Sequence, residues 1–316
     1  MLRYEFCYKE SWEFESAWPV NGWDVFISAF NSSERVRKVF DQASAQAKHW
    51  FVSPEYGYKA DELPQGQNWF FGDANDEGAA IVDFVSQLNC DFSKATVCVD
   101  TTGFMRHHLL ILIRHLVALG LHKFDALYSE PLQYARKEKT VFSDGEVREV
   151  RQISGFEGNH NPDTANDLLI IGAGYDHPLI AHAAEFKSNA KKIQVLGFPS
   201  LRPDMYQENV LQAHKAAEQM GARIGQIDSV FAPANDPFVT AGTLARVVER
   251  FARAKPISNL YLCPISTKAL TLGFGLYYLS EWSGKNASMI LPYTRTYSKQ
   301  TSEGVGRIWW YRIELT

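Results

Sequence analysis

The chain has 316 residues, enough for two domains at about 100–200 residues per domain. Hydrophobic residues make up 46% and charged residues 22%, a composition that supports packed cores and excludes a disordered chain. A formal net charge of −4 excludes a general attraction to nucleic acid or to an anionic membrane. The sequence has no apolar run of about 18 residues and no signal peptide at its start, so we expect a cytoplasmic protein without a membrane span.

The first half alternates β-rich runs with amphipathic stretches. Strands are predicted at Trp23–Phe30, His49–Ser53, Ala95–Asp100 and Phe124–Tyr128, and helices at Arg35–Gln46, Asp76–Leu88 and Arg106–Leu119. The charged stretch Gln133–Arg151 is typical of an exposed hairpin or flap. Such alternation predicts a parallel sheet covered by helices.

A second series follows Gly155–Asn166, which has the composition of a linker or a long functional loop. Strands are predicted at Asp167–Ile171, Lys192–Leu196, Ser229–Ala232 and Asn259–Cys263, with helices after them at about Pro178–Lys187, Pro203–Met220, Phe238–Ala254 and Lys268–Trp282. In the tail, Ser288–Tyr293 and Gly306–Leu315 are predicted to form an antiparallel pair at a sheet edge. We therefore predict an α/β protein of two Rossmann-like parallel-sheet units, residues 1–154 and 155–316, with an antiparallel C-terminal edge.

Polar residues follow several strands of the second half, and ligands bind open α/β sheets at the carboxyl ends of the strands. The residues in question are Gly172, Gly174, Asp176 and His177 after one strand, Ser200 after the next, Asn235 and Asp236 after the third, and Ser266, Thr267 and Lys268 after the fourth. Each loop alone also fits ordinary turn and helix-cap chemistry. Because all four loops lie at one end of one predicted sheet, the sequence favours a polar binding site there.

Two of these loops suggest an anionic ligand. Gly172–His177 begins as G-x-G, but His177 stands where a dinucleotide fingerprint has its third glycine, so a standard NAD site is not expected. The two glycines would still let the backbone approach an anion at a helix N-terminus. Lys268 follows two hydroxyl residues at a helix start, which is either a phosphate cradle or a solvated lysine at a turn. For Asp176 the sequence favours a contribution to capping its helix.

The histidines and cysteines form no recognisable metal motif, and we predict no metal site and no cofactor. His107 and His108 are adjacent, so we expect them to point to different helix faces, where both cannot easily serve one site, and to be core or interface residues. Glu55 and Glu157 lie in predicted loops and could act as acids or bases, but no partner is indicated for either.

The segment Asn259–Leu279, NLYLCPISTKALTLGFGLYYL, resembles the last strand–loop–helix of CRISPR-associated Rossmann-fold (CARF) sensors. Ser266, Thr267 and Lys268 match the ligand-contacting end of that loop, whereas Pro264 and Ile265 depart from its usual Thr-Gly-Gly character. The resemblance implies a cyclic or linear oligonucleotide messenger as ligand and a dimeric protein. The run WDVFISAF at Trp23–Phe30 is similar to the first strand of Toll/interleukin-1 receptor domains.

Three functions are consistent with these features. The leading hypothesis is a nucleotide- or phosphate-ligand-binding module, a sensor or accessory protein in bacterial defence. One alternative is a nucleotide hydrolase or transferase with Asp176 or His177 as base and Lys268 stabilising charge. The other is a structural subunit of a larger complex. The apolar helix Leu109–Leu119 and the pair Trp309–Trp310 predict a homodimer or a partner protein, and no duplex nucleic acid is expected.

Overall fold

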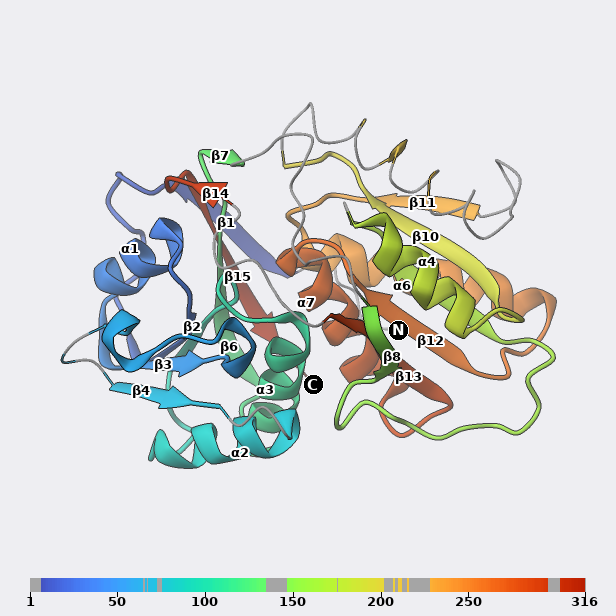
Figure 1. Cartoon of the computed structure of the whole chain (residues 1–316), viewed down its shortest axis with the longest axis horizontal. Helices are drawn as coiled ribbons and strands as arrows, with labels where there is room; N and C mark the ends of the chain where they lie inside the picture. Colours follow the sequence, from blue (N-terminus) through green and yellow to red (C-terminus); the bar gives the residue numbers. More distant parts are fainter. Residues whose placement is uncertain are drawn as a thin grey trace. The chain divides into compact units, whose positions relative to one another are not determined.

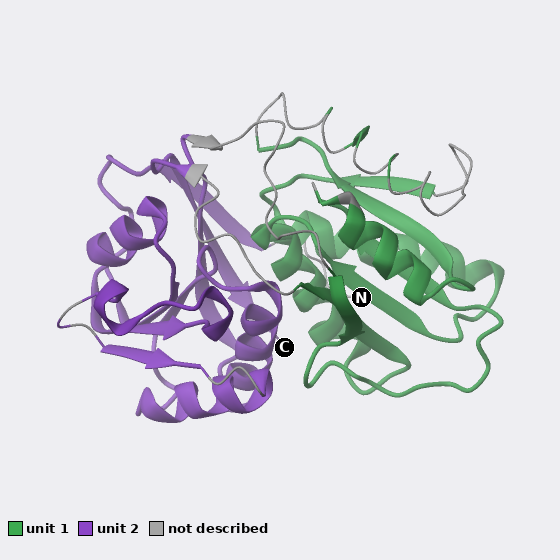
Figure 2. Cartoon of the chain, viewed as in Figure 1, with its two compact units in different colours: residues 1–6, 143–295 green, residues 7–142, 296–316 purple. Residues whose placement is uncertain are grey.

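The computed structural model describes residues 7–64, 66, 68–72, 76–134, 147–174, 176–201, 207, 210–211, 215, 228–294 and 302–315 (Figure 1). The chain divides into two compact units (Figure 2): the described part of unit 1 lies within residues 143–295, and that of unit 2 within residues 7–142 and 296–316. Unit 1 is therefore inserted between two segments of unit 2. We expected one boundary, between residues 154 and 155. The observed division differs because the C-terminal segment, within residues 296–316, belongs to the unit formed by the first half of the chain.

Unit 2 contains a seven-stranded sheet in the order β1-β15-β6-β5-β2-β3-β4. Its strands are β1 (Tyr8–Glu13), β2 (Trp23–Phe30), β3 (Ala45–Val52), β4 (Asn68–Phe71), β5 (Val97–Asp100), β6 (Lys123–Ser129) and β15 (Arg307–Glu314). Strands β2 to β6 pair in parallel, and β15 pairs antiparallel with β6 and β1. The parallel strands have the Rossmann order 3-2-1-4-5, which puts the topological switch point between β2 and β5.

The helices of unit 2 are α1 (Glu34–Gln42), α2 (Glu77–Gln87) and α3 (Arg106–Ala118), with short 3-10 turns η2 (Pro54–Tyr56) and η3 (Ala60–Glu62). Local chemistry fixes their ends. Asp76 caps α2 by accepting hydrogen bonds from Gly78 N and Ala79 N, both at 2.9 Å. Lys48 Nζ donates to the last carbonyls of α1, at 2.7 Å to Phe40 O. In the core of this unit the Phe40 and Trp50 rings stack with centroids 3.7 Å apart.

The C-terminal strand is antiparallel, as predicted, but its predicted pairing with Ser288–Tyr293 is wrong. Strand β15 completes the sheet of unit 2, and Ile308, Trp310 and Tyr311 are buried there. Trp309 is half-buried, and its Nε1 donates to Glu130 Oε1 at 2.7 Å. Helix α3 is likewise buried from His107 to Ile113. Helix α3 and the pair Trp309–Trp310, which favoured a homodimer, thus pack within their own unit. They no longer support a homodimer, which remains a prediction.

Unit 1 contains a six-stranded sheet in the order β11-β10-β9-β12-β13-β8. Its strands are β8 (Val147–Gln152), β9 (Leu168–Gly172), β10 (Lys191–Gly197), β11 (Asp228–Ala232), β12 (Leu260–Pro264) and β13 (Ala287–Thr294). Strands β9 to β13 are parallel, again in the order 3-2-1-4-5, and β8 is antiparallel at the edge. The switch point lies between β9 and β12. The predicted fold class, two Rossmann-like α/β units with antiparallel edge strands, is confirmed.

The described helices of unit 1 are α4 (His177–Phe186), α6 (Pro237–Ala254) and α7 (Lys268–Tyr277), the last continued by the π-helical turn η4 (Tyr278–Trp282). Helices α6 and α7 pack against each other. A Cβ on Gly273 would lie 2.5 Å from Pro237 O, so glycine permits this close approach. The helix expected over Pro203–Met220 and most of the expected flap at Gln133–Arg151 lie outside the described residues. A short ladder of β7 (Gln133–Tyr134) and β14 (Ser302–Glu303) stands apart from both sheets.

The segment Gly155–Asn166, expected as a linker between the units or a long functional loop, connects β8 and β9 within unit 1 and so does not join the two units. The Asn259 side chain holds it: Nδ2 donates to Asn161 O at 3.0 Å, and Oδ1 accepts from Asn161 N at 2.7 Å. A Cβ on Gly158 would lie 1.7 Å from Ala287 O, so the loop packs directly on the start of β13. Over the described stretches of the chain, no helix is long and apolar enough to cross a membrane.

Candidate functional site

The switch point of unit 1 is formed by the loops after β9 and β12. The two strands are paired with Gly172 opposite Pro264, so both loops leave the sheet at the same level. They also touch, because Ile265 N donates to Gly172 O at 3.1 Å and a Cβ on Gly174 would lie 2.4 Å from Ile265 O. Gly174 is therefore required for the close approach of these two loops. Helices α4 and α7 begin directly after them.

The other two predicted loops join this edge through hydrogen bonds. Ala234 N, after β11, donates to Pro199 O, after β10, at 2.9 Å. Thr267 Oγ1, after β12, donates to Ala234 O at 2.6 Å. Strands β11 and β12 are separated in the sheet by β10 and β9, so this bond spans the ends of two strands. The structure thus links the loops that carry Ser200, Asn235 and Ser266.

Two of the residues expected to bind a ligand serve instead as helix caps. Asp236 Oδ1 accepts from Phe238 N and Val239 N, both at 3.0 Å, and caps α6. Thr267 Oγ1 accepts from Leu270 N at 3.2 Å and caps α7, in addition to its bond to Ala234 O. For these two residues the helix-cap interpretation describes what the side chains do.

The remaining predicted residues lie around the same edge with different exposure. Gly172, Gly174, Asp176 and Ser266 are buried, whereas Ser200, Asn235 and Lys268 are half-buried. Asp176 occupies the N-cap position of α4, but its side chain makes no capping hydrogen bond. The side chain of His177 lies outside the described part of the chain. Lys268 is the first residue of α7, and a helix N-terminus favours negative charge.

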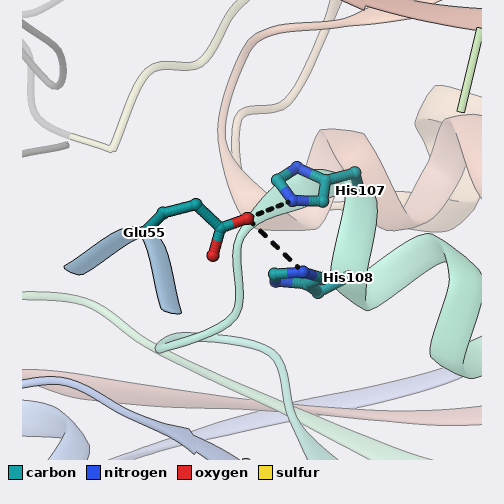
Figure 3. Close-up of side chains that lie close together, drawn as sticks. All are labelled: Glu55, His107 and His108. Atoms are coloured by element: carbon teal, nitrogen blue, oxygen red, sulfur yellow. Dashed lines mark hydrogen bonds and ion pairs between the residues drawn. The ribbon is translucent and has the colours of Figure 1, made fainter. Parts of the chain in front are cut away.

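Unit 2 brings together three side chains at the corresponding edge of its own sheet (Figure 3). Glu55 lies in the turn after β3, and His107 and His108 lie in the first turn of α3, after β5. Glu55 Oε1 is 3.2 Å from His107 Nε2 and 3.6 Å from His108 Nε2. The two imidazole centroids are only 4.1 Å apart. Both histidines are buried, as expected of core residues, but the expectation that both cannot easily serve one site is wrong, because both rings face Glu55.

The electrostatics of this cluster favour an ionised Glu55. Burial raises the pKa of its carboxyl, but the hydrogen bond from His107 and the charges of His108 and His107 lower that pKa to about 2. A second carboxylate approaches from α2, with Glu77 Oε2 3.8 Å from His107 Nε2. In the described part of the chain, Glu55, His107 and His108 form a group whose possible ligand atoms lie within 4.8 Å of one another.

Asp100 is buried at the switch point of unit 2. Ser28 Oγ donates to Oδ2 at 2.9 Å and Thr102 N donates to Oδ1 at 3.0 Å. Burial raises the pKa of the Asp100 carboxyl, and the bonds from Thr102 and Ser28 oppose that shift. A Cβ on Gly103 would lie 1.9 Å from the carbonyl of Ala29 at the end of β2. The loop after β5 therefore packs directly on β2 at this switch point.

A cavity of about 540 Å³ lies at the opposite, amino edge of the same sheet, around the starts of β2, β5 and β6. Its cationic side chains have carboxylate partners at 2.7–3.5 Å in the pairs Lys94–Asp91, Lys123–Glu314 and Arg312–Asp125. These positive charges are balanced locally, so the cavity is a weaker candidate for an anionic ligand than the carboxyl edge of unit 1.

No family model matches the chain, and no curated protein matches it significantly. Among solved structures, one assigned to the universal stress proteins of Pseudomonas aeruginosa UCBPP-PA14 is similar over 84% of this chain and 92% of its own, with 9% identity and a TM-score of 0.27. A functionally unknown protein of Pseudomonas aeruginosa PAO1 is similar over 85% and 93%, with 10% identity and a TM-score of 0.27. An N-terminal ketoreductase of the macrolactin assembly line has 13% identity and a TM-score of 0.22 over 81% of this chain and 64% of its own. Likenesses this distant carry no functional argument.

Proposed function

We propose that unit 1 binds a nucleotide or another phosphate-bearing small molecule at the carboxyl edge between β9 and β12. The observation that carries this proposal is the strand order, which makes these two strands the topological switch point of a Rossmann-type sheet. The polar residues singled out from the sequence follow the strands that end at this edge.

The chemistry of the edge suits an anion. Helices α4 and α7 both begin there, and helix N-termini offer N–H groups and positive dipole ends to phosphate. Gly174 lets the loops after β9 and β12 lie close together, and Lys268 adds a cation at the first position of α7. The fold already uses Asp236 and Thr267 as helix caps, so the ligand contacts in this proposal fall to Gly174, Ser266 and Lys268, with Ser200 and Asn235 at the rim.

Calorimetric titration with adenine nucleotides, NAD⁺ and cyclic or linear oligoadenylates tests the proposal. The oligoadenylates are included because of the CARF resemblance of Asn259–Leu279. Lys268→Ala should weaken binding about ten- to a hundred-fold, since a charge-assisted hydrogen bond contributes roughly 1.5–3 kcal/mol. Lys268→Glu should weaken it further, and Ser266→Ala by less than Lys268→Ala.

Lys255→Ala is the matched control, because Lys255 is exposed and follows α6 on the way into β12, at the other edge of the sheet. It should bind as the wild type does. Unchanged affinity in both Lys268 variants, or no binding by any compound of the panel, would contradict the proposal. A parallel turnover assay distinguishes a sensor from an enzyme: if Asp176 acts as a base, Asp176→Asn retains binding and loses turnover.

The proposal extends to the setting expected from the sequence: a cytoplasmic sensor or accessory protein of bacterial defence that acts as a homodimer or with a partner protein. Light scattering at micromolar concentration, with and without the bound nucleotide, tests the assembly. A monomer under both conditions, with no partner recovered by pull-down, would contradict that part.

A further inference from the structure

Two imidazoles and one carboxylate of unit 2 converge where two parallel strands end. Strands β3 and β5 flank β2 in the sheet and run parallel to it, so the elements that follow them emerge at the same edge. The turn after β3 supplies Glu55, and the first turn of α3 supplies His107 and His108 (Figure 3). This edge is the one at which open α/β sheets bind ligands.

The spacing of the three side chains is that of metal ligands. Zn²⁺ binds imidazole nitrogen and carboxylate oxygen at about 2.0–2.2 Å, and tetrahedral geometry then separates neighbouring ligand atoms by about 3.3–3.6 Å. Glu55 Oε1 lies 3.2 Å from His107 Nε2 and 3.6 Å from His108 Nε2. The two separations from Glu55 Oε1 thus match those of neighbouring ligands, and all three ligand atoms lie within 4.8 Å of one another.

The surroundings hold the imidazoles in this orientation. His107 is 3% exposed and His108 is fully buried. Ser53 Oγ lies within hydrogen-bond distance of His108 Nδ1, at 3.4 Å, while the other ring nitrogen, Nε2, faces Glu55. The Phe51 ring packs edge-on against His108 at 4.9 Å. Metal-binding histidines typically have such a partner on the second ring nitrogen.

Charge and access also suit a cation. Glu55 supplies one negative charge, and Glu77, 3.8 Å from His107 Nε2, supplies another nearby. The Glu55 side chain is 26% exposed, which gives an ion and a water molecule a route to the site. Two imidazoles with a carboxylate, and no thiolate, form the ligand set of catalytic Zn²⁺ and of non-haem Fe²⁺.

We propose that Glu55, His107 and His108 bind one divalent transition-metal ion of the Zn²⁺ and Fe²⁺ class, with a coordination position left for water or a substrate oxygen. This site lies in unit 2 and is independent of the nucleotide proposal for unit 1. Ser53 is a positioning residue, which acts by fixing the His108 ring.

The test uses the full chain, expressed without a histidine tag and stripped with a chelator. Zn²⁺ is titrated calorimetrically, and Co²⁺ is titrated by visible absorption as a spectroscopic probe. We expect one equivalent of either ion per chain. His107→Ala and Glu55→Gln should each lower the metal affinity by roughly a hundred-fold or more. Mutating a residue that only hydrogen-bonds a metal ligand typically lowers metal affinity 10–100-fold, and removing the ligand itself should cost more. Ser53→Ala should lower it about ten-fold and alter the Co²⁺ spectrum.

His115→Ala is the matched control, because His115 lies in the same helix but outside the cluster. It should bind both ions as the wild type does. Glu55→Gln preserves the shape of the side chain, so it keeps the test interpretable if His107→Ala fails to fold. The proposal is overturned if neither ion binds, or if the folded Glu55→Gln variant binds as tightly as the wild type.

Discussion

Thr267 offers the sharpest test of how unit 1 is held together. Its hydroxyl accepts from Leu270 N at 3.2 Å, which caps α7, and donates to Ala234 O at 2.6 Å, which links the loops after β11 and β12. Thr267→Val keeps the shape of the side chain and removes both bonds. Thr267→Ser keeps both bonds and removes one methyl group.

The magnitude follows from the two bonds. Losing an N-cap hydroxyl costs about 1 kcal/mol of stability. The Ala234 carbonyl belongs to a residue that is 4% exposed, and a buried acceptor left without its donor costs about 1–3 kcal/mol. Because the two losses share one side chain and are not strictly additive, we expect Thr267→Val to destabilise unit 1 by about 2–3 kcal/mol. Thr267→Ser should lose at most about 0.8 kcal/mol, the contribution of one buried methyl group.

The tryptophans allow each unit to be followed separately. Of the eight in the chain, only Trp282 lies within residues 143–295. In protein labelled with fluorotryptophan, the Trp282 resonance reports the urea unfolding of unit 1, and the other resonances report unit 2. Thr267→Val should shift the Trp282 transition to lower urea and leave the others in place. Equal Trp282 transitions in Thr267→Val and Thr267→Ser would refute the assignment of both hydrogen bonds.

The same labelled protein tests three further expectations. The Trp309 and Trp310 resonances should disappear with those of unit 2, because β15 belongs to that sheet; loss together with Trp282 would contradict the observed division. Burial raises the folded-state pKa of Asp100, so the stability that its protonated form supports is lost as the pH rises through that pKa. The wild type should therefore lose stability relative to Asp100→Asn from about pH 4 upwards, and a wild type that gains stability relative to Asp100→Asn over this range would contradict this. Gly103→Ala places its Cβ 1.9 Å from a β2 carbonyl and should destabilise unit 2 by about 1–3 kcal/mol, measured as an earlier transition of the unit 2 resonances; an unchanged midpoint would contradict the close packing.

The strands of the parallel sheets could be predicted because their composition reflects burial on both faces. Trp23–Phe30 has the predicted bounds, and seven of its eight residues are buried. The strand expected at Asp167–Ile171 is observed at Leu168–Gly172, where all five residues are buried. A strand covered on both faces is apolar throughout, and this pattern is visible without knowing its partners. The alternation of such strands with helices then predicts the fold class.

Strand partners could not be predicted in the same way. The run at Gly306–Leu315 has strong β propensity, but propensity does not specify which strand lies beside it. Proximity in sequence favoured Ser288–Tyr293, whereas β15 pairs with β6 and β1. Strand β1 was missed because only one of its six residues is buried, so it carries little of the apolar pattern that reveals an inner strand. Strands β6 and β15 pair although their partner residues are more than 170 positions apart in the sequence. Packing in the hydrophobic core, which includes Ile308 and Trp310, determines such a pairing.

The histidine pair shows where reasoning from helix angles fails. Consecutive residues of an α-helix project about 100° apart, which favoured separate faces for His107 and His108. In the first turn of α3, however, a side chain from another loop can lie between the two directions, and Glu55 approaches both rings there. Glu55 comes three residues after β3, and His107 comes seven residues after β5. The rule that polar residues beyond the carboxyl ends of parallel strands gather at one edge, applied to the second half of the sequence, therefore also indicates this cluster in the first half. The ends of β3 and β5 place the loops that carry these three side chains at one edge of the sheet. That placement, rather than the angle between consecutive residues of the helix, determines which side chains meet.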